Sequence, residues 1–170
     1  MSDTNENTPD SRTEDAAQAE HSDNEFARIR GEKLAALREA GKDPFQITVC
    51  DRDRTAEEIR SRFEELENKD VCIAGRIMSW RDMGKAGFLD IYDRTGRMQV
   101  YAKIDQVGEE SYTDLKNCWD LGDIISVKGY VFKTRRGEIS VHAKELQLLS
   151  KSLLCLLYTS DAADDLLCVD

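Results

Sequence analysis

The sequence predicts an all-β barrel of five strands over residues 71–150, preceded by an α-helical N-terminal arm. The first observation is a change of period: apolar residues recur at helical spacing before residue 71 and alternate with polar residues after it. The second is a set of five alternating stretches separated by turn-forming residues. The third is their order, in which a short helix separates the third strand from the fourth. That order is typical of an OB-fold barrel.

Residues 25–70 are expected to form the helical arm. Its first helix begins at Glu25 and is stopped by Gly41 and Pro44. Its second begins after Thr55, where "TAEE" is a capping box in which Glu58 reaches back to the cap. The apolar stripes are Phe26, Ile29, Leu34 and Leu37 in the first helix, and Ile59, Phe63 and Leu66 in the second. The exposed face of the first helix is basic, with Arg28, Arg30, Lys33, Arg38 and Lys42.

The barrel strands follow from the alternation and from the turns between the stretches. The second and third strands are joined through Arg94-Thr95-Gly96, and the fourth and fifth through Arg135-Arg136-Gly137. The strands are expected at residues 71–80, 87–93, 97–104, 123–134 and 137–149, with the short helix at 109–119.

The two ends of the chain carry most of its net negative charge. The formal net charge is −10, but residues 71–150 hold twelve Lys and Arg against eleven Asp and Glu. Residues 1–24 contain almost nothing to bury and are expected to form a disordered acidic tail. A partner of the middle region would therefore not meet a strongly acidic domain.

Several classes of protein do not fit the composition. The five cysteines are odd in number and form no CxxC pair, which favours reduced thiols over a disulfide framework. The two histidines, His21 and His142, lie far apart with no Cys/His cluster, so no metal site is expected. No apolar run is long enough to span a membrane. The N-terminus is acidic and polar, unlike a secretory signal.

The hairpin "GFLDIYDRTGRMQVYAK", residues 87–103, separates two kinds of side chain by alternation. Leu89, Ile91, Met98, Val100 and Ala102 are expected to point into the core, and Phe88, Asp90, Tyr92, Gln99, Tyr101 and Lys103 to point out. Aromatic rings beside an amide and a cation are the chemistry that holds unpaired bases. The same pattern also fits an ordinary amphipathic sheet whose rings cover a neighbouring element.

The connection between the fourth and fifth strands is basic. Lys133, Arg135 and Arg136 stand at a hairpin tip beside Glu138. Such a loop can hold phosphates electrostatically. A solvated turn has the same composition, so this motif by itself does not decide between the two.

Three longer stretches resemble one family. "RGEKLAALREAGKDPF", "AGRIMSWRDMGKAGFLDIYDRTGRMQVY" and "WDLGDIISVKGYVFKTRRGEISVHAKELQLLSKSL" resemble the N-terminal anticodon-binding region of class II lysyl-tRNA synthetases of the bacterial type. The resemblance extends over about residues 25–153. Aspartyl- and asparaginyl-tRNA synthetases share the domain type and fit the arm and the spacing less well.

The resemblance implies roles for four residues. Phe88 matches an aromatic that stacks on an anticodon base, and Gln99 matches the amide that reads the central uridine. Arg76 matches an arginine on the same surface, and Glu138 matches an acid that contacts an anticodon base. The partner implied is the anticodon stem-loop of tRNA(Lys), with anticodon UUU, and the basic first helix is expected along the stem backbone.

The resemblance also sets expectations for the whole enzyme. The parent family is cytoplasmic, is expected to be a homodimer, and attaches lysine to tRNA with ATP and Mg²⁺. Its class II motifs are not found here, so no catalytic, cofactor-binding or metal-binding residue is assigned, and this chain alone is expected to be inactive. Residues 71–153 are thus expected to be the OB domain of an enzyme fragment that lacks the catalytic domain.

The last segment departs from the family. Residues 154–170, "LCLLYTSDAADDLLCVD", resemble a translated sequencing adapter and are expected to be non-native. An amphipathic C-terminal helix is the alternative. Two other functions also remain for the barrel: a free-standing OB protein that binds single strands without sequence choice, and a protein-interaction module that uses the outward rings Phe88, Tyr92 and Tyr101.

Overall fold

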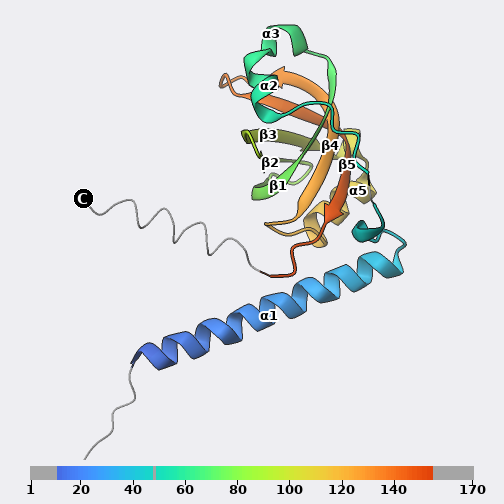
Figure 1. Cartoon of the computed structure of the whole chain (residues 1–170). Helices are drawn as coiled ribbons and strands as arrows, with labels where there is room; N and C mark the ends of the chain where they lie inside the picture. The colour runs from blue at the N-terminus through green and yellow to red at the C-terminus, as the bar shows by residue number, and fades with distance from the viewer. Residues whose placement is uncertain (1–10, 48, 155–170) are drawn as a thin grey trace, which may run out of the picture.

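The structure, a computed structural model, describes residues 11–47 and 49–154 (Figure 1). The strands are β1 (Asp70–Asp82), β2 (Ala86–Asp93), β3 (Gly96–Lys103), β4 (Ile124–Lys133) and β5 (Ile139–Ser150). The helices are α1 (Ser11–Glu39), the 3-10 turn η1 (Pro44–Gln46), α2 (Ala56–Ser61), α3 (Phe63–Leu66), α4 (Ile104–Val107) and α5 (Glu109–Asn117). All five predicted strands are present, and α4 and α5 stand between β3 and β4.

The five strands close into a barrel in the order β1-β2-β3-β5-β4. All neighbouring pairs are antiparallel except β3 and β5, which run parallel over a short stretch in which Gln99 faces Ser140 and Tyr101 faces His142. This topology confirms the predicted OB fold. In this closed barrel every strand has two neighbours, so no strand is left as an open edge.

The core consists of the inward residues of every strand. All five inward residues predicted in the hairpin are buried, and Leu89 and Val100 have no exposed surface. Helix α5 adds Tyr112 and Leu115 to the same core. Alternation therefore sorted the inner face of β2 and β3 correctly, because each strand has one face against a single packed interior.

The arm follows the prediction in part. Thr55 and Glu58 form the predicted capping box at the start of α2, and the helical segment is interrupted at Arg62 before α3. Helix α1 ends at Glu39 as expected but begins at Ser11, well before Glu25. Helix α1 thus extends into residues 11–24, which were expected to be disordered and which include three Ala and two Glu but no Gly or Pro to stop a helix.

Two glycines permit close packing between strands. A Cβ at Gly129 would lie 2.0 Å from the carbonyl oxygen of His142, where β5 shifts register against β4. A Cβ at Gly87 would lie 2.2 Å from the indole ring of Trp80. A side chain at either position would have to separate elements of the barrel wall.

A charged cluster holds the arm, the barrel and the end of β5 together. The ammonium group of Lys151 lies 2.5 Å from Asp120 Oδ2 and 2.8 Å from Asp123 Oδ2, and the side chains of Lys151 and Asp123 have no exposed surface. Lys33 of α1 lies 2.5 Å from Asp120 Oδ1. Burial by itself would raise the pKa of Asp120, but hydrogen bonds from both lysines outweigh it and lower that pKa.

Much of the basic face of α1 is therefore turned to the barrel. Besides Lys33, Arg30 donates to the Ser152 carbonyl at 3.1 Å. Lys42, just after the helix, lies 2.5 Å from Asp114 and 2.6 Å from Glu110 of α5. These three cations dock the arm and are not a free surface for RNA, in contrast to the expectation for the whole basic face.

Candidate nucleic-acid interface

The outer face of β2 and β3 brings the predicted binding residues into register. Phe88 is the cross-strand neighbour of Tyr101, Asp90 of Gln99, and Tyr92 of Arg97. Tyr92 is 46% exposed, whereas Phe88 and Tyr101 are half-buried. The predicted outward face exists, but part of it is covered by neighbouring side chains.

The covering side chains are aromatic. The ring centroids of Phe88 and Tyr101 lie 4.9 Å apart, and His142 of β5 lies 4.9 Å from Tyr101. His142 in turn stacks on Tyr130 of β4, with an interplanar angle of 9°. With Phe132, which contacts Tyr101, Tyr130 and His142, these residues form a continuous aromatic layer across β2, β3, β5 and β4.

The aromatic layer combines both explanations considered for the hairpin rings. Its members pack on one another, and only Phe88 and Tyr101 could be found in the hairpin sequence. Burial lowers the pKa of His142, so its ring is neutral at pH 7. The layer is therefore an uncharged surface, and stacking is the contact it offers to a base.

Gln99 departs from the prediction of an exposed side chain. It is 8% exposed, and its Oε1 accepts a hydrogen bond from Ser140 Oγ at 2.9 Å. The cause is the parallel pairing of β3 with β5, which sets Ser140 directly beside Gln99. The side chain does lie on the outer face, but the fifth strand fixes and partly covers it.

A row of charges runs beside Gln99. Arg97 lies 2.9 Å from Asp90 Oδ1 and 3.6 Å from Glu138 Oε1. The hydrogen bond with Asp90 raises the pKa of Arg97, and Glu138 adds a smaller coulombic effect. Sequence reasoning did not select Arg97, although its position two residues before Gln99 places it on the same outer face.

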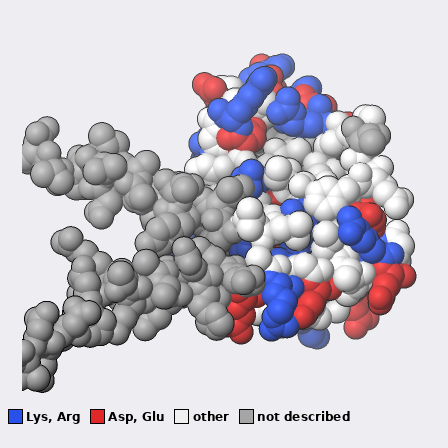
Figure 2. All heavy atoms as spheres, turned by 60° about the horizontal axis from the view of Figure 1, so that its bottom comes forward, with Lys and Arg blue, Asp and Glu red and all other residues white. Residues whose placement is uncertain are grey.

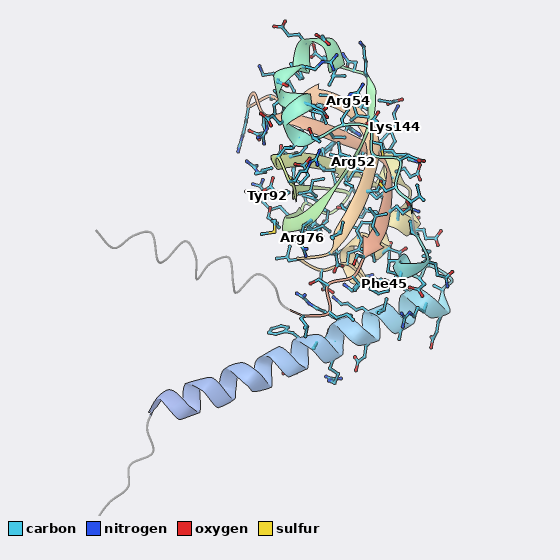
Figure 3. All side chains as sticks on the ribbon, viewed as in Figure 1. Phe45, Arg52, Arg54, Arg76, Tyr92 and Lys144 are labelled. Carbon is cyan, nitrogen blue, oxygen red and sulfur yellow. The ribbon has the colours of Figure 1, made fainter. Side chains whose placement is uncertain are left out.

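Arg76 stands at the other end of this surface. It lies opposite Tyr92 in the β1–β2 register, and both side chains are labelled on the same side of the barrel in Figure 3. Its Nη1 donates to the Gly122 carbonyl at 2.7 Å, which fixes the guanidinium group. Arg76 is therefore nearer to Tyr92 than to Phe88, since Tyr92 and Phe88 are four residues apart on β2, about 13 Å along the strand.

The loop between β4 and β5 carries the three predicted basic residues. Lys133, Arg135 and Arg136 are all exposed, and the loop is closed by hydrogen bonds between Thr134 and Glu138. Lys133 Nζ lies 5.9 Å from the centre of the Phe63 ring in α3. Within residues 25–47 and 49–154 none of the three basic side chains forms an ion pair, so they remain available to a phosphate.

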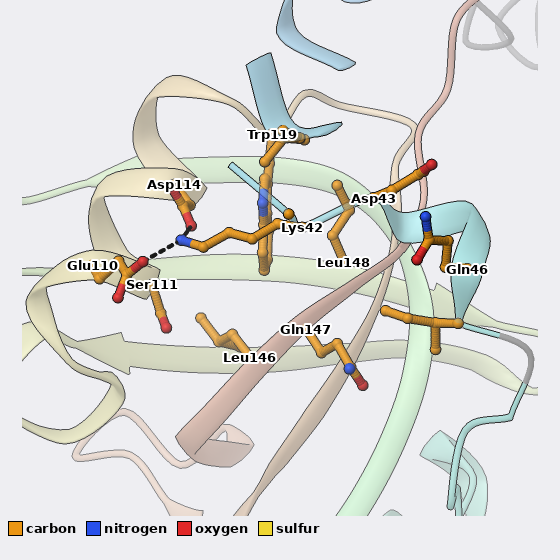
Figure 4. A pocket seen from close by; sticks show the side chains of 13 residues that line it. Lys42, Asp43, Gln46, Glu110, Ser111, Asp114, Trp119, Leu146, Gln147 and Leu148 are labelled. Carbon is orange, nitrogen blue, oxygen red and sulfur yellow. Dashed lines mark hydrogen bonds and ion pairs between the residues drawn. The ribbon is translucent and has the colours of Figure 1, made fainter. Parts of the chain in front are cut away.

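A pocket lies elsewhere, at the seam between the arm and the barrel (Figure 4). It measures about 460 Å³ and is lined by residues of η1, α5 and β5 and by the end of the arm helix. The hydrogen bonds from Lys42 to Asp114 and Glu110 cross it, and they raise the pKa of Lys42. This pocket belongs to the docking of the arm and holds none of the predicted base-reading residues.

One face of the molecule is mixed in charge. Figure 2 shows basic and acidic side chains interspersed over the part of the face that the structure describes. In that part of the chain no cluster of three or more His, Cys, Asp or Glu could hold a metal ion. Among its helices none is long and apolar enough to cross a membrane.

Comparison with known proteins agrees with this geometry. Residues 71–149 match the family described as an OB-fold nucleic acid binding domain. The chain is 50% identical over 130 residues to the lysine–tRNA ligase of Clostridium tetani (strain Massachusetts / E88), covering 76% of this chain and 26% of the relative. The lysine–tRNA ligases of Clostridium kluyveri and Clostridium novyi are 49% and 48% identical over the same length.

The match covers 130 residues of this chain but only part of each relative. The chain spans about a quarter of the length of the lysine–tRNA ligases that it matches. Residues 154–170 were expected to be non-native, and all of them except Leu154 lie outside the described residues. This chain therefore contains an OB-fold domain of the tRNA-anticodon family, homologous at about 50% identity to part of lysine–tRNA ligase.

Proposed function

We propose that the barrel binds the anticodon loop of tRNA(Lys) on the outer face of β2 and β3. The observation that carries the proposal is the joint placement of Phe88, Gln99 and Glu138 on one face of an OB-fold domain homologous to lysine–tRNA ligases. Phe88 supplies a ring for stacking. Gln99 and Glu138 supply polar groups for base edges, and RNA loops are read through just such unstacked bases.

The polar groups suit uracil. Its Watson–Crick edge presents two carbonyl acceptors on either side of one N3–H donor. Gln99 Nε2 and the Arg76 guanidinium group can donate to carbonyls, and the Glu138 carboxylate can accept from N3–H. A UUU anticodon offers this edge three times, which supports the assignment of the lysine tRNA.

The loop at 133–137 is proposed to hold the RNA backbone. Lys133, Arg135 and Arg136 stand at the end of the face nearest Glu138, and phosphate contacts of this kind position a nucleic acid without reading sequence. Arg28 and Arg38 of α1, which are exposed and pair only with Glu32 and Asp43 within the described residues, can add to this contact.

We further propose that the whole protein is a cytoplasmic lysine–tRNA ligase that works as a homodimer and uses ATP and Mg²⁺ to attach lysine. This part rests on the homology alone, and the barrel contributes tRNA recognition to it. The residues of this chain then select the tRNA, while the chemistry belongs to other parts of the enzyme.

Binding of an anticodon stem-loop tests the site directly. Phe88→Ala is expected to weaken binding of a UUU stem-loop by about 1–3 kcal/mol, because one stacking contact is lost. The measurement is fluorescence anisotropy, with circular dichroism as the check on folding. Phe45→Ala is the matched control, since Phe45 is 47% exposed on η1 and away from the face, and it should bind as the parent does.

One result of this experiment would contradict the proposed site. A folded Phe88→Ala protein that binds the UUU stem-loop as tightly as the parent contradicts the anticodon site on this face. The aromatic layer would then serve packing alone.

A further inference from the structure

We propose that the N-terminal arm fixes the direction in which the chain leaves the barrel, through a charge joint formed by Lys33 of α1, Asp120 and Lys151. Residues 151–153, the exit segment, follow the end of β5 at Ser150. Helix α1 lies across the end of the barrel at which β5 finishes (Figure 1). The first helix and the exit segment therefore meet, although they are far apart in the sequence.

The exit segment is bound to the barrel by its first two residues. The ammonium group of Lys151 contacts the carboxylates of Asp120 and Asp123, and the Ser152 N–H donates to Asp123 Oδ1 at 2.8 Å. The Asp120 N–H donates to Asp123 Oδ2, also at 2.8 Å. The side chains of Lys151 and Asp123 have no exposed surface, so this inner network is sealed from water. Asp120, which is 19% exposed, lies at its outer edge.

The arm binds the same network from outside. Lys33 contacts Asp120 Oδ1, whereas the exit segment uses Oδ2 of the same carboxylate. Arg30, nearly one turn earlier on α1, donates to the Ser152 carbonyl at 3.1 Å. A Cβ at Gly122 would lie 3.0 Å from Ser152 Oγ, so the loop before β4 packs closely against the exit segment here. One carboxylate thus joins the arm to the outgoing chain, and a second arm cation holds the carbonyl that follows.

Apolar packing holds only one part of α1. Leu34 and Leu37 are buried, whereas Phe26 and Ile29 are 55% and 36% exposed. The part of α1 nearest the exit segment is therefore held by the polar contacts of its two cations. The ion pair between arm and barrel is open to solvent, since its side chains are 28% and 19% exposed. Local opening at these outer contacts should be possible while the barrel stays folded, and it would remove the outer support of the exit segment.

A fixed exit has a consequence for a longer chain. The matched region is 26% of the length of the Clostridium tetani relative. If the whole protein is a longer ligase, as proposed above, the direction of the exit segment sets how the barrel is oriented relative to the part that follows. This consequence rests on that proposal, whereas the charge joint rests on the contacts of this chain alone.

Hydrogen exchange at the Ser152 N–H, measured by NMR on the full chain, reports on the exit segment. Its acceptor belongs to a fully buried side chain, so exchange requires the segment to open. Arg30→Met with Lys33→Met removes both arm cations and keeps two long side chains. We expect this double variant to exchange the Ser152 N–H at least about tenfold faster than the parent.

Two further variants separate the contacts from the charge of the helix. Arg28→Met with Arg38→Met is the matched control, because it removes the same number of charges from α1 at exposed positions that pair with Glu32 and Asp43 of the arm itself. It should leave the Ser152 exchange rate unchanged. Arg30→Lys with Lys33→Arg keeps both charges and should restore most of the protection. The amides of the β2–β3 ladder report whether the barrel as a whole remains stable.

Each outcome bears on the joint. Faster exchange at Ser152 in Arg30→Met with Lys33→Met, with unchanged ladder amides and no effect in the control variant, supports it. An unchanged Ser152 rate would show that the barrel alone holds the exit segment, which overturns the proposal. Equal acceleration at Ser152 and in the ladder would indicate a general loss of stability and would overturn the local coupling as well. None of these results depends on RNA binding, so the proposed function is tested separately.

Discussion

Replacing Lys151 with methionine is expected to destabilise the protein by about 3–5 kcal/mol, because removal of one partner from a buried ion pair leaves an uncompensated charge. The Lys151 ammonium group has no exposed surface and contacts two carboxylates, at 2.5 Å and 2.8 Å. Methionine keeps the length of the side chain but not its charge. Asp120 still has Lys33, so the unpaired charge is that of Asp123, whose side chain is fully buried.

Urea denaturation followed by tryptophan fluorescence measures this loss. Both tryptophans of the chain, Trp80 and Trp119, lie in the barrel domain, and Trp119 adjoins Asp120. Lys128→Met is the matched control, since Lys128 is exposed on β4 and lies 3.8 Å from an exposed partner, Glu145. An exposed pair of this kind contributes little, so this control should stay within about 0.5 kcal/mol of the parent.

A double variant tests the electrostatic cause. Asp123→Asn removes the stranded charge, so Lys151→Met with Asp123→Asn should lose less stability than the two single changes added together. A loss below about 1 kcal/mol for Lys151→Met alone would refute the reasoning, because a truly buried lysine cannot be removed so cheaply. Strict additivity in the double variant would show that packing and not charge is responsible.

Three further outcomes are expected. Gly129→Ala should destabilise the protein by about 3 kcal/mol in urea denaturation, since the added Cβ would collide with the backbone of β5. Gly31→Ala should instead stabilise it by about 0.5–1 kcal/mol, because position 31 of α1 has open space and glycine is unfavourable inside a helix. Hydrogen bonds from Lys116, a backbone N–H and a tyrosine lower the pKa of Asp82 to about 2. A carboxylate whose pKa is lower in the folded state stabilises the fold above its unfolded pKa and loses this effect as the pH falls. The melting temperature should therefore fall between about pH 4 and pH 2, and it should fall less in Asp82→Asn. Arg135→Ala should weaken UUU and UCU stem-loops alike and reduce the slope of log K against log salt by about 0.7–1, and a change in base preference would contradict a phosphate contact.

Local pattern was enough to predict the strands and the inner face of the hairpin. Leu89 and Val100 alternate with polar neighbours, and a single buried interior makes that alternation decisive. The capping box at Thr55 was predictable for the same reason, since both of its partners lie within four residues.

Contacts between distant segments could not be predicted in this way. Gln99 is covered by Ser140, 41 residues later, only because barrel closure sets β5 beside β3. Lys33 and Lys151 contact Asp120 although both are far from it in the sequence, and no repeating sequence pattern reveals such contacts. The sequence therefore predicted which hairpin side chains lie on the outer face, but not the hydrogen bond between Ser140 and Gln99 or the use of arm lysines in docking.

The strand order has a consequence for how the chain folds. The last strand to leave the ribosome, β5, occupies a place between β3 and β4, so the meander of β1, β2 and β3 cannot become a closed barrel until the whole domain has been synthesised. Until then β3 and β4 each keep an unsatisfied edge. Since β1 also pairs with β4 across more than 40 residues, the rate-limiting step must bring remote segments together, and refolding on a timescale of about milliseconds to seconds is expected.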